Sequence, residues 1–280
     1  MSATAVPTTL ECAEAAGLRL WRRQKPRHER VTTPLVLLHG IGSRGQSFAG
    51  LMAALPEEID VIAWDAPGYG GSRPLDNPTP APRDYADALA AALDRLGIAR
   101  IALVGHSLGA LFATNFAAHH ARRVSALALL SPALGYRVSP GEALPAKVQA
   151  RIDDLQKLGP ADFAKARAHR LVYQPERKPE IARAVEDAMA AVDPAGYAQA
   201  VQALGRGDLL ADARRITAPA LVAVGAQDVI TPPDNARQAH EALTGSRFHQ
   251  IADAGHALPQ EAPQAVATLL APLFEDAVHA

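Results

Sequence analysis

The sequence predicts an α/β protein with a mostly parallel β-sheet and helices on both faces of that sheet. Three observations support this class. Short apolar runs alternate with amphipathic stretches through the first half of the chain, a long stretch of helix-forming residues follows, and the alternation then resumes. The sheet is therefore expected to be interrupted by the helical stretch and to continue after it.

The first half of the chain has the pattern βαβαβ. Apolar runs bounded by turn residues predict strands at 34–39, 59–65, 101–104 and 124–130. The spacing of apolar residues predicts a helix at 83–96, ended by Gly97, and a second helix at 107–120.

The residue composition changes between residues 133 and 205. Helix formers dominate there, no β run occurs, and Arg, Lys, Glu and Gln are frequent. After it the sequence predicts a strand at 220–224, a helix at 234–243, a short strand at 247–251 and a closing helix at 261–275. We therefore expect one core formed by residues 1–132 and 206–280, with residues 133–205 as a helical insertion.

Composition limits the classes of partner. Of 280 residues, 49% are hydrophobic, and 28 Lys and Arg balance 29 Asp and Glu. No net field would draw the chain to nucleic acid or to an anionic membrane, so neither is expected as a partner. A small-molecule substrate is expected instead, and homo-oligomerisation stays open.

The number of cysteines and the N-terminal residues indicate the cellular compartment in which the protein is expected. A single cysteine, Cys12, excludes an internal disulfide framework and any cysteine-built metal site, and it is interpreted as an inert strand residue. No metal and no cofactor are expected. Residues 1–9 lack the basic start and apolar run of a secretion signal, and no 18 consecutive apolar residues occur. These features predict a cytoplasmic protein.

The pentapeptide GHSLG at 105–109 lies between a predicted strand and a predicted helix, so Ser107 falls on the turn between them. A turn this sharp strains the serine backbone, and Gly105 and Gly109 remove side chains that would collide with the neighbouring strand and helix. The turn exposes the hydroxyl above the sheet, directs the positive helix end at it, and leaves the N–H of Leu108 free to bind an oxyanion. Ser107 is therefore predicted to be the nucleophile of a serine hydrolase.

A serine hydroxyl needs a histidine as base, and that histidine needs a carboxylate to orient it. Asp228 follows the predicted strand 220–224, and His256 follows the strand 247–251 beside Gly255, which permits a tight, exposed turn. Parallel strands share their carboxyl edge, so both side chains are expected on the side where Ser107 emerges. The other carboxylates considered for the acid role are Asp212, Asp234 and Asp253, and Asp228 is preferred.

The second oxyanion donor is expected in the loop after the strand 34–39, within HGIGS at 39–43. The N–H of Ile41 is the preferred donor and Gly42 is the reserve. Losing one such donor slows acyl transfer by roughly a hundred to a thousandfold. His39 itself is predicted to be a structural hydrogen-bonding residue beneath the loop.

The same loop also satisfies a dinucleotide-binding pattern. Gly40, Gly42 and Gly45 form GxGxxG after a strand, and Asp65 closes the next strand about 20 residues later, as a ribose-binding carboxylate would. This alternative leaves GHSLG, the Asp228 loop and the Gly255-His256 turn without a role. Tight binding of NADH would favour it.

The segments HGIGS, DAPGYGGS, GHSLG, GAQDVITPP and DAGHA, in this order between about Val31 and Glu275, resemble the α/β-hydrolase superfamily. The resemblance implies an eight-stranded sheet with a helical lid inserted after the sixth strand. It also implies Ser107 as nucleophile, Asp228 and His256 as its partners, and the N–H groups of Ile41 and Leu108 as the oxyanion hole. Relatives with aspartate at the elbow are dehalogenases and epoxide hydrolases, so serine favours hydrolysis through an acyl-enzyme.

Within that superfamily, VDPAGYA at 192–198 followed by GDLL at 207–210 resembles enol-lactonases that act on 3-oxoadipate enol-lactone and related hydrolases of small carboxylates. Arg167 or Arg170 of the lid would then bind the substrate carboxylate. The resemblance predicts an esterase or lactonase. Two alternatives stay open: a carbon-carbon bond hydrolase of ring-fission products, disfavoured because such relatives show Asn where this chain has His106, and a non-catalytic small-molecule receptor.

Overall fold

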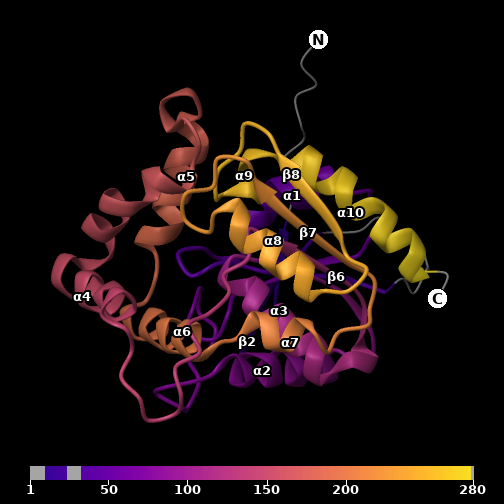
Figure 1. Ribbon diagram of the computed structural model, residues 1–280, viewed down its shortest axis with the longest axis horizontal. Coiled ribbons are helices and arrows are strands. Elements are labelled where there is room, and N and C mark those ends of the chain that lie inside the picture. The colour runs from indigo at the N-terminus through magenta and orange to yellow at the C-terminus, as the bar shows by residue number, and fades with distance from the viewer. Residues whose placement is uncertain (1–9, 24–32, 279–280) are drawn as a thin grey trace.

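The computed structural model describes residues 10–23 and 33–278. Its strands form a single eight-stranded sheet (Figure 1). The segment 1–9, predicted to lack a secretion signal, and Val31 lie outside the described residues. The strand order is β1-β2-β4-β3-β5-β6-β7-β8. The strands are β1 (Leu10–Ala15), β2 (Leu18–Arg23), β3 (Leu35–Leu38), β4 (Val61–Trp64), β5 (Ile101–His106), β6 (Val124–Leu130), β7 (Ala220–Gly225) and β8 (Arg247–Ile251).

Six strands, β4-β3-β5-β6-β7-β8, pair in parallel, whereas β1 and β2 form an antiparallel hairpin on the β4 edge. The predicted mostly parallel sheet is confirmed, and the strand 247–251 has the predicted bounds. The strand β1 has no periodic signal of its own because four of its six residues are exposed, Cys12 among them. The alternation of buried and exposed residues that identifies a half-buried strand is therefore absent from β1.

Helices cover both faces of the sheet, because successive side chains of each central strand point to opposite sides. Leu35 and Leu37 pack into one core, which α1 (Ala49–Ala54), α9 (Leu258–Glu261) and α10 (Pro263–Val278) complete. Val36 and Leu38 pack into the other core, which lies under α2 (Pro82–Arg95), α3 (Leu108–His119), α7 (Leu209–Ala213) and α8 (Pro233–Ala242).

The segment from 133 to 205, called the cap segment below, leaves the sheet after β6 and returns through α7 to β7. Its helices are α4 (Ala146–Arg167), α5 (Pro179–Ala190) and α6 (Pro194–Arg206), with short 3₁₀ turns η3 (Ala168–Leu171) and η4 (Pro175–Arg177) between α4 and α5. In Figure 1 these helices lie on the opposite side of the molecule from α10. The helix α4 is interrupted at Gly159, where φ is +72°, directly before Pro160.

One predicted helix differs from the structure, and one helix of the structure was not predicted. The closing helix does not run from 261 to 275, because α9 ends at Glu261 and α10 starts at Pro263. Ala262 between them is non-helical, as expected for a residue before proline. The short helix α7 was not expected. By contrast, α2 stops where Gly97 was expected to end it, at a residue with φ of +69°.

No helix of residues 10–23 and 33–278 is both long and apolar enough to cross a membrane.

Arg23, at the end of β2, fixes the end of α1. Its buried guanidinium donates to the backbone carbonyls of Met52 and Leu55, at 2.6 and 2.8 Å, and to those of Pro56 and Ile59, at 2.5 and 2.6 Å. The last carbonyls of a helix have no partner within the helix, so a buried cation that binds them replaces a cap.

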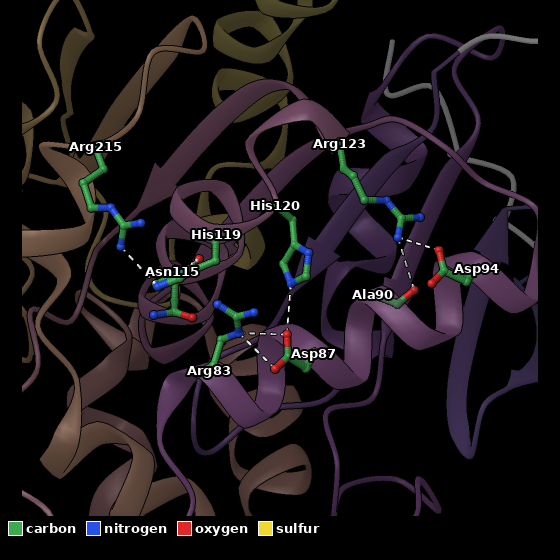
Figure 2. A network of polar contacts seen from close by, with 9 residues as sticks. All are labelled: Arg83, Asp87, Ala90, Asp94, Asn115, His119, His120, Arg123 and Arg215. Carbon is green, nitrogen blue, oxygen red and sulfur yellow. Dashed lines mark hydrogen bonds and ion pairs between the residues drawn. The ribbon is translucent and has the colours of Figure 1, made fainter.

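We expect Arg23→Met to lower the free energy of unfolding by about 3 kcal/mol, because several partly buried carbonyls lose charge-assisted donors at once. Urea unfolding followed by circular dichroism measures the change. The matched control is Arg83→Met, which removes an exposed ion pair with Asp87 on α2, where both side chains are about half exposed (Figure 2). That pair belongs to the surface network between α2 and α3, and its loss should cost less than about 1 kcal/mol. Equal effects of the two substitutions would contradict the role of Arg23.

Candidate active site

Ser107 occupies the turn between β5 and α3 in a strained backbone conformation, with φ of +56° and ψ of −116°. The side chain is nearly buried, and the N–H of Ser107 donates to the carbonyl of Leu130 on β6 at 2.9 Å. A Cβ on Gly105 would lie 2.3 Å from the carbonyl oxygen of Gly109, and one on Gly109 would lie 2.1 Å from that of Leu38. The turn therefore requires glycine at both positions, as the sequence predicts.

Three predicted side chains meet at the carboxyl edge of the sheet, although they come from three different loops. The Ser107 hydroxyl lies 3.0 Å from Nε2 of His256, and Nδ1 of His256 lies 2.9 Å from Oδ2 of Asp228. Because an ionised carboxylate only accepts hydrogen bonds, the proton of the neutral imidazole lies on Nδ1. Nε2 is then free to accept from Ser107.

The Asp228 carboxylate is fixed by its own loop. Its Oδ1 accepts from the backbone N–H groups of Ile230 and Thr231, at 2.8 and 2.9 Å. Burial alone raises the pKa of Asp228, but the His256 ring and the two N–H donors outweigh burial and lower this pKa to about 2. Asp228 is therefore ionised at every pH near neutrality.

The competing carboxylates form other contacts. Asp212 accepts from Asn115 at 2.7 Å, and Asp234 accepts from Gln238 at 3.0 Å. The backbone carbonyl of Asp253 accepts from Lys178. Among the described residues, Asp228 is the one acid that reaches His256.

The loop after β3 is held from below. His39 is buried, its Nδ1–H donates to the carbonyl of Gly40 at 2.8 Å, and its Nε2 accepts from the N–H of Ala66 at 3.0 Å. Burial lowers the pKa of His39, which keeps this ring neutral. The Tyr69 hydroxyl donates to the carbonyl of Ile41 at 2.8 Å. His39 thus has the structural position that the sequence predicts.

The candidate oxyanion donors face the same cavity as Ser107. Ile41, Gly42 and Leu108 all line a cavity of about 450 Å³ that also contains Ser107 and His256. In the described part of the chain, no group accepts a hydrogen bond from the backbone N–H of Ile41 or of Leu108. Both N–H groups are therefore available to a ligand atom in this cavity.

Thr231 and His106 also contact the site, although neither is predicted from the sequence to do so. The Thr231 hydroxyl donates to the carbonyl of Ser131 at 2.9 Å, and its oxygen lies 3.0 Å from Oδ2 of Asp228 and 3.1 Å from Nδ1 of His256. The spacing Asp228-x-x-Thr231 after a strand is the signal that could have identified it, because short polar residues close such turns.

His106 precedes the nucleophile and is buried. Its Nε2–H donates to the backbone carbonyl of His256 at 2.7 Å. Burial lowers the pKa of His106 to about 3, and the neighbouring His256 acts in the same direction. The ring is therefore neutral near pH 7, and it links the elbow to the loop that carries His256.

The cavity is basic on the side of α4 and η3. The basic residues that line it are Lys147, Arg151, Arg167 and Arg170, and no acidic residue of the described chain lines it. Both predicted arginines are thus at the cavity. Arg167, however, is ion-paired with Asp154 and lies over the Phe163 ring, 4.7 Å from its centroid, whereas Arg170 is exposed.

Arg151 also lines the cavity, and no sequence pattern identifies it. It is half-buried on α4, and among the described residues it forms no ion pair. Burial raises the pKa of Tyr197, while the Arg151 guanidinium beside the hydroxyl acts in the opposite direction. Arg151 therefore combines partial burial, a free positive charge and a place at the cavity.

The dinucleotide alternative does not fit this structure. Oδ1 of Asp65 accepts from the N–H of Gly45 at 2.7 Å, and Oδ2 accepts from Nε1 of Trp21 at 2.8 Å. Asp65 is 1% exposed, and a Cβ on Gly45 would lie 2.8 Å from the carbonyl oxygen of Trp64. The carboxylate that would bind a ribose is therefore occupied inside the core.

The fold and this geometry agree with the comparisons to known proteins. The family described as alpha/beta hydrolase fold matches residues 33–263, which is more than half of the chain. The chain belongs to the α/β-hydrolase family. It is an enzyme of the hydrolase class.

Individual relatives are esterases and hydrolases. The chain is 30% identical over 246 residues to the pimeloyl-[acyl-carrier protein] methyl ester esterase of Neisseria meningitidis, which spans 84% of this chain and 92% of that one. It is 32% identical over 234 residues to a Klebsiella pneumoniae protein named as a carbamate hydrolase, RutD. The match covers 80% of this chain and 84% of that one. The crystal structure of the enol-lactonase of Burkholderia xenovorans LB400 superposes with a TM-score of 0.83 at 26% identity, covering 95% of this chain and all of that one.

Proposed function

We propose that this enzyme hydrolyses an ester or lactone bond of a small, carboxylate-bearing molecule through an acyl-enzyme. The observation that carries the proposal is the continuous hydrogen-bonded chain from Ser107 through His256 to Asp228, which opens into a cavity of about 450 Å³. A hydroxyl bonded to an oriented neutral imidazole is the arrangement that activates a serine for acyl transfer.

Each step of the proposed reaction has a group in place. Ser107 attacks the carbonyl carbon while Nε2 of His256 takes its proton, and ionised Asp228 stabilises the imidazolium that forms. The N–H groups of Ile41 and Leu108 bind the oxyanion of the tetrahedral intermediate. His256 then donates the proton to the leaving alcohol, and a water molecule, deprotonated by the same ring, releases the acid and restores Ser107.

The charge of the cavity supports an anionic substrate. Four basic side chains line the cavity on the side of α4 and η3, and no acidic residue of the described chain lines it, although Arg167 is paired with Asp154 outside the lining. Such a wall attracts a substrate carboxylate and orients it by charge-assisted hydrogen bonds. The names of two relatives, a methyl ester esterase and an enol-lactonase, are in keeping with an ester or lactone as the scissile bond.

A substrate panel tests the reaction. Purified protein is incubated with methyl esters, γ-lactones and δ-lactones, each with and without a free carboxylate, and the acid released is measured by titration at constant pH. Coloured ring-fission diketones are tested in parallel by the loss of their absorbance. Hydrolysis of carboxylate-bearing esters or lactones is expected. Decay of the coloured diketones without any ester or lactone hydrolysis would replace the proposal with carbon-carbon bond hydrolysis.

We expect Arg151→Met to raise KM for a half-ester such as monomethyl adipate by roughly 10- to 100-fold, which is the usual effect of losing one charge-assisted contact. KM for the neutral ester methyl hexanoate should change less than about threefold. The control is Lys157→Met on the same helix, because Lys157 is exposed and does not line the cavity. Equal effects of Arg151→Met on both esters would show that Arg151 does not bind the carboxylate.

A further inference from the structure

The backbone on both sides of His256 is fixed by groups from elsewhere in the fold. The N–H of Gly255 donates to Oε1 of Glu261 at 2.9 Å, and the N–H of Ala257 donates to the carbonyl of Leu171 at 2.8 Å. The His256 carbonyl accepts from His106 at 2.7 Å. Two of these three contacts depend on the cap segment or on Glu261, and only one comes from the elbow.

The Glu261 side chain is fully buried, and its carboxylate joins two parts of the chain. While Oε1 binds the loop at Gly255, Oε2 accepts from the N–H of Tyr173 at 3.0 Å and from Nζ of Lys178 at 2.8 Å. Tyr173 and Lys178 belong to the cap segment. A buried carboxylate requires a cation and donors to stay ionised, so Lys178 is the charge partner on which this junction depends.

Lys178 also binds the loop directly. Its ammonium donates to the carbonyl of Asp253 at 2.6 Å, and its side chain is 23% exposed. The loop residues Asp253 and Gly255 are thus both held, one by Lys178 and the other by its partner Glu261. A Cβ on Gly255 would lie 2.9 Å from the N of Tyr173, which shows how closely the two segments approach.

The same helix connects this junction to the cavity. Lys178 directly precedes α5, and Val185, Ala188 and Met189 of α5 line the cavity. Met189 also contacts the oxyanion loop, since a Cβ on Gly42 would lie 2.9 Å from its terminal methyl. One helix therefore contacts the cavity at its C-terminal end and the loop of His256 at its N-terminal end.

We propose that Lys178 and Glu261 are positioning residues, which hold the His256 ring within reach of Ser107 by fastening the loop at 253–257 to the cap segment. This inference rests on the proposed function, because His256 acts as a base only in that reaction. Neither side chain lines the cavity, so their effect passes through the backbone of His256. A displacement of a base by about 1 Å is enough to reduce a rate roughly 100-fold.

The test is Lys178→Met, measured with p-nitrophenyl acetate as substrate. A neutral side chain of similar length leaves Glu261 without its cation and the Asp253 carbonyl without its donor. We expect kcat to fall roughly 10- to 100-fold with KM within about threefold of wild type, since binding residues are unchanged. The control is Lys165→Met, which removes an ion pair with Asp162 that is about two-thirds exposed, also in the cap segment. It should leave kcat within twofold.

A second observable separates positioning from stability. In ¹⁵N-histidine-labelled protein, the Nδ1 proton of His256 that is bonded to Asp228 should give a sharp low-field resonance, which is expected to broaden or shift in Lys178→Met and to persist in Lys165→Met. If Lys178→Met does not fold, Glu261→Gln, which keeps the side-chain size but not the charge, is measured by the same two readouts.

The outcomes are distinguishable. A folded Lys178→Met variant with wild-type kcat and an unchanged His256 resonance overturns the inference, as does a loss confined to KM. Failure of the proposed function looks different, because the wild-type enzyme itself would then hydrolyse neither p-nitrophenyl acetate nor any other ester, while the His256 resonance would still report the coupling to Lys178.

Discussion

Ser107→Ala is expected to reduce kcat for ester hydrolysis by roughly 10⁵- to 10⁶-fold, the loss typical of removing the nucleophile of such a site. The substitution replaces the hydroxyl with hydrogen and so removes the oxygen that lies 3.0 Å from Nε2 of His256. The cavity, the oxyanion donors and the His256–Asp228 pair do not depend on that oxygen, so KM should change little. Initial rates with p-nitrophenyl acetate, and labelling by a fluorophosphonate probe, measure the effect.

Ser131→Ala is the matched control for this experiment. Ser131 follows β6 at the same edge of the sheet, is fully buried and has φ of +47°, and its hydroxyl has no hydrogen-bond partner in the described part of the chain. Its loss should leave the rate and the labelling near wild type. Labelling of Ser107→Ala at the wild-type rate would show that another residue is the nucleophile.

The parts of the site that could be predicted from the sequence are the local ones. GHSLG, the Asp228 loop and the Gly255-His256 turn each occupy a few consecutive residues after a strand, and their parallel strands bring them to one edge. That logic places Ser107, Asp228 and His256 together without any knowledge of side-chain packing. The sheet and the central strands are predictable for the same reason, because burial on both faces gives continuous apolar runs.

The parts that could not be predicted depend on segments distant in sequence. Glu261 meets Lys178 across 83 residues, and His106 meets the His256 carbonyl across 150. Glu261 and Lys178 lie in no recognisable motif, and the GHSLG motif does not indicate the distant partner of His106. Arg151 and Arg167 lie on the same helix, and only the position of Asp154 decides that Arg167 is neutralised while Arg151 is free. The sequence identifies a basic cap segment, but packing decides which of its charges faces the cavity uncompensated.

Asp228→Asn is expected to lower kcat by about 10⁴-fold with a nearly unchanged structure. The backbone N–H groups of Ile230 and Thr231 hold Oδ1, so an asparagine keeps its oxygen there and turns its amide group to the place of Oδ2, toward His256. An amide donor requires Nδ1 to accept. The ring proton then moves to Nε2, which can no longer take the proton of Ser107.

The pH dependence follows from the pKa of Asp228, which the His256 ring and the loop donors lower to about 2 against the effect of burial. A carboxyl whose pKa is lower in the folded than in the unfolded state stabilises the fold above its unfolded pKa, and this stabilisation disappears as the pH falls from about 4 to 2. Asp228 therefore stays ionised from pH 5 to 9. A fall in wild-type activity between pH 7 and 5 cannot arise from protonation of Asp228.

The control for Asp228→Asn is Asp234→Asn, an exposed carboxylate six residues further on that contacts Gln238 and not His256. It should retain kcat within about twofold. Nitrogen-15 shifts of the labelled His256 ring report the tautomer directly, with the proton on Nδ1 in the wild type and on Nε2 in Asp228→Asn. A rate loss below tenfold, or an unchanged tautomer, would mean that Asp228 does not orient His256. The predicted defect is a misplaced proton in an intact fold. The free energy of unfolding of Asp228→Asn at pH 7 should therefore lie within about 2 kcal/mol of the wild-type value. A lost rate without a larger loss of stability separates orientation of His256 from simple destabilisation.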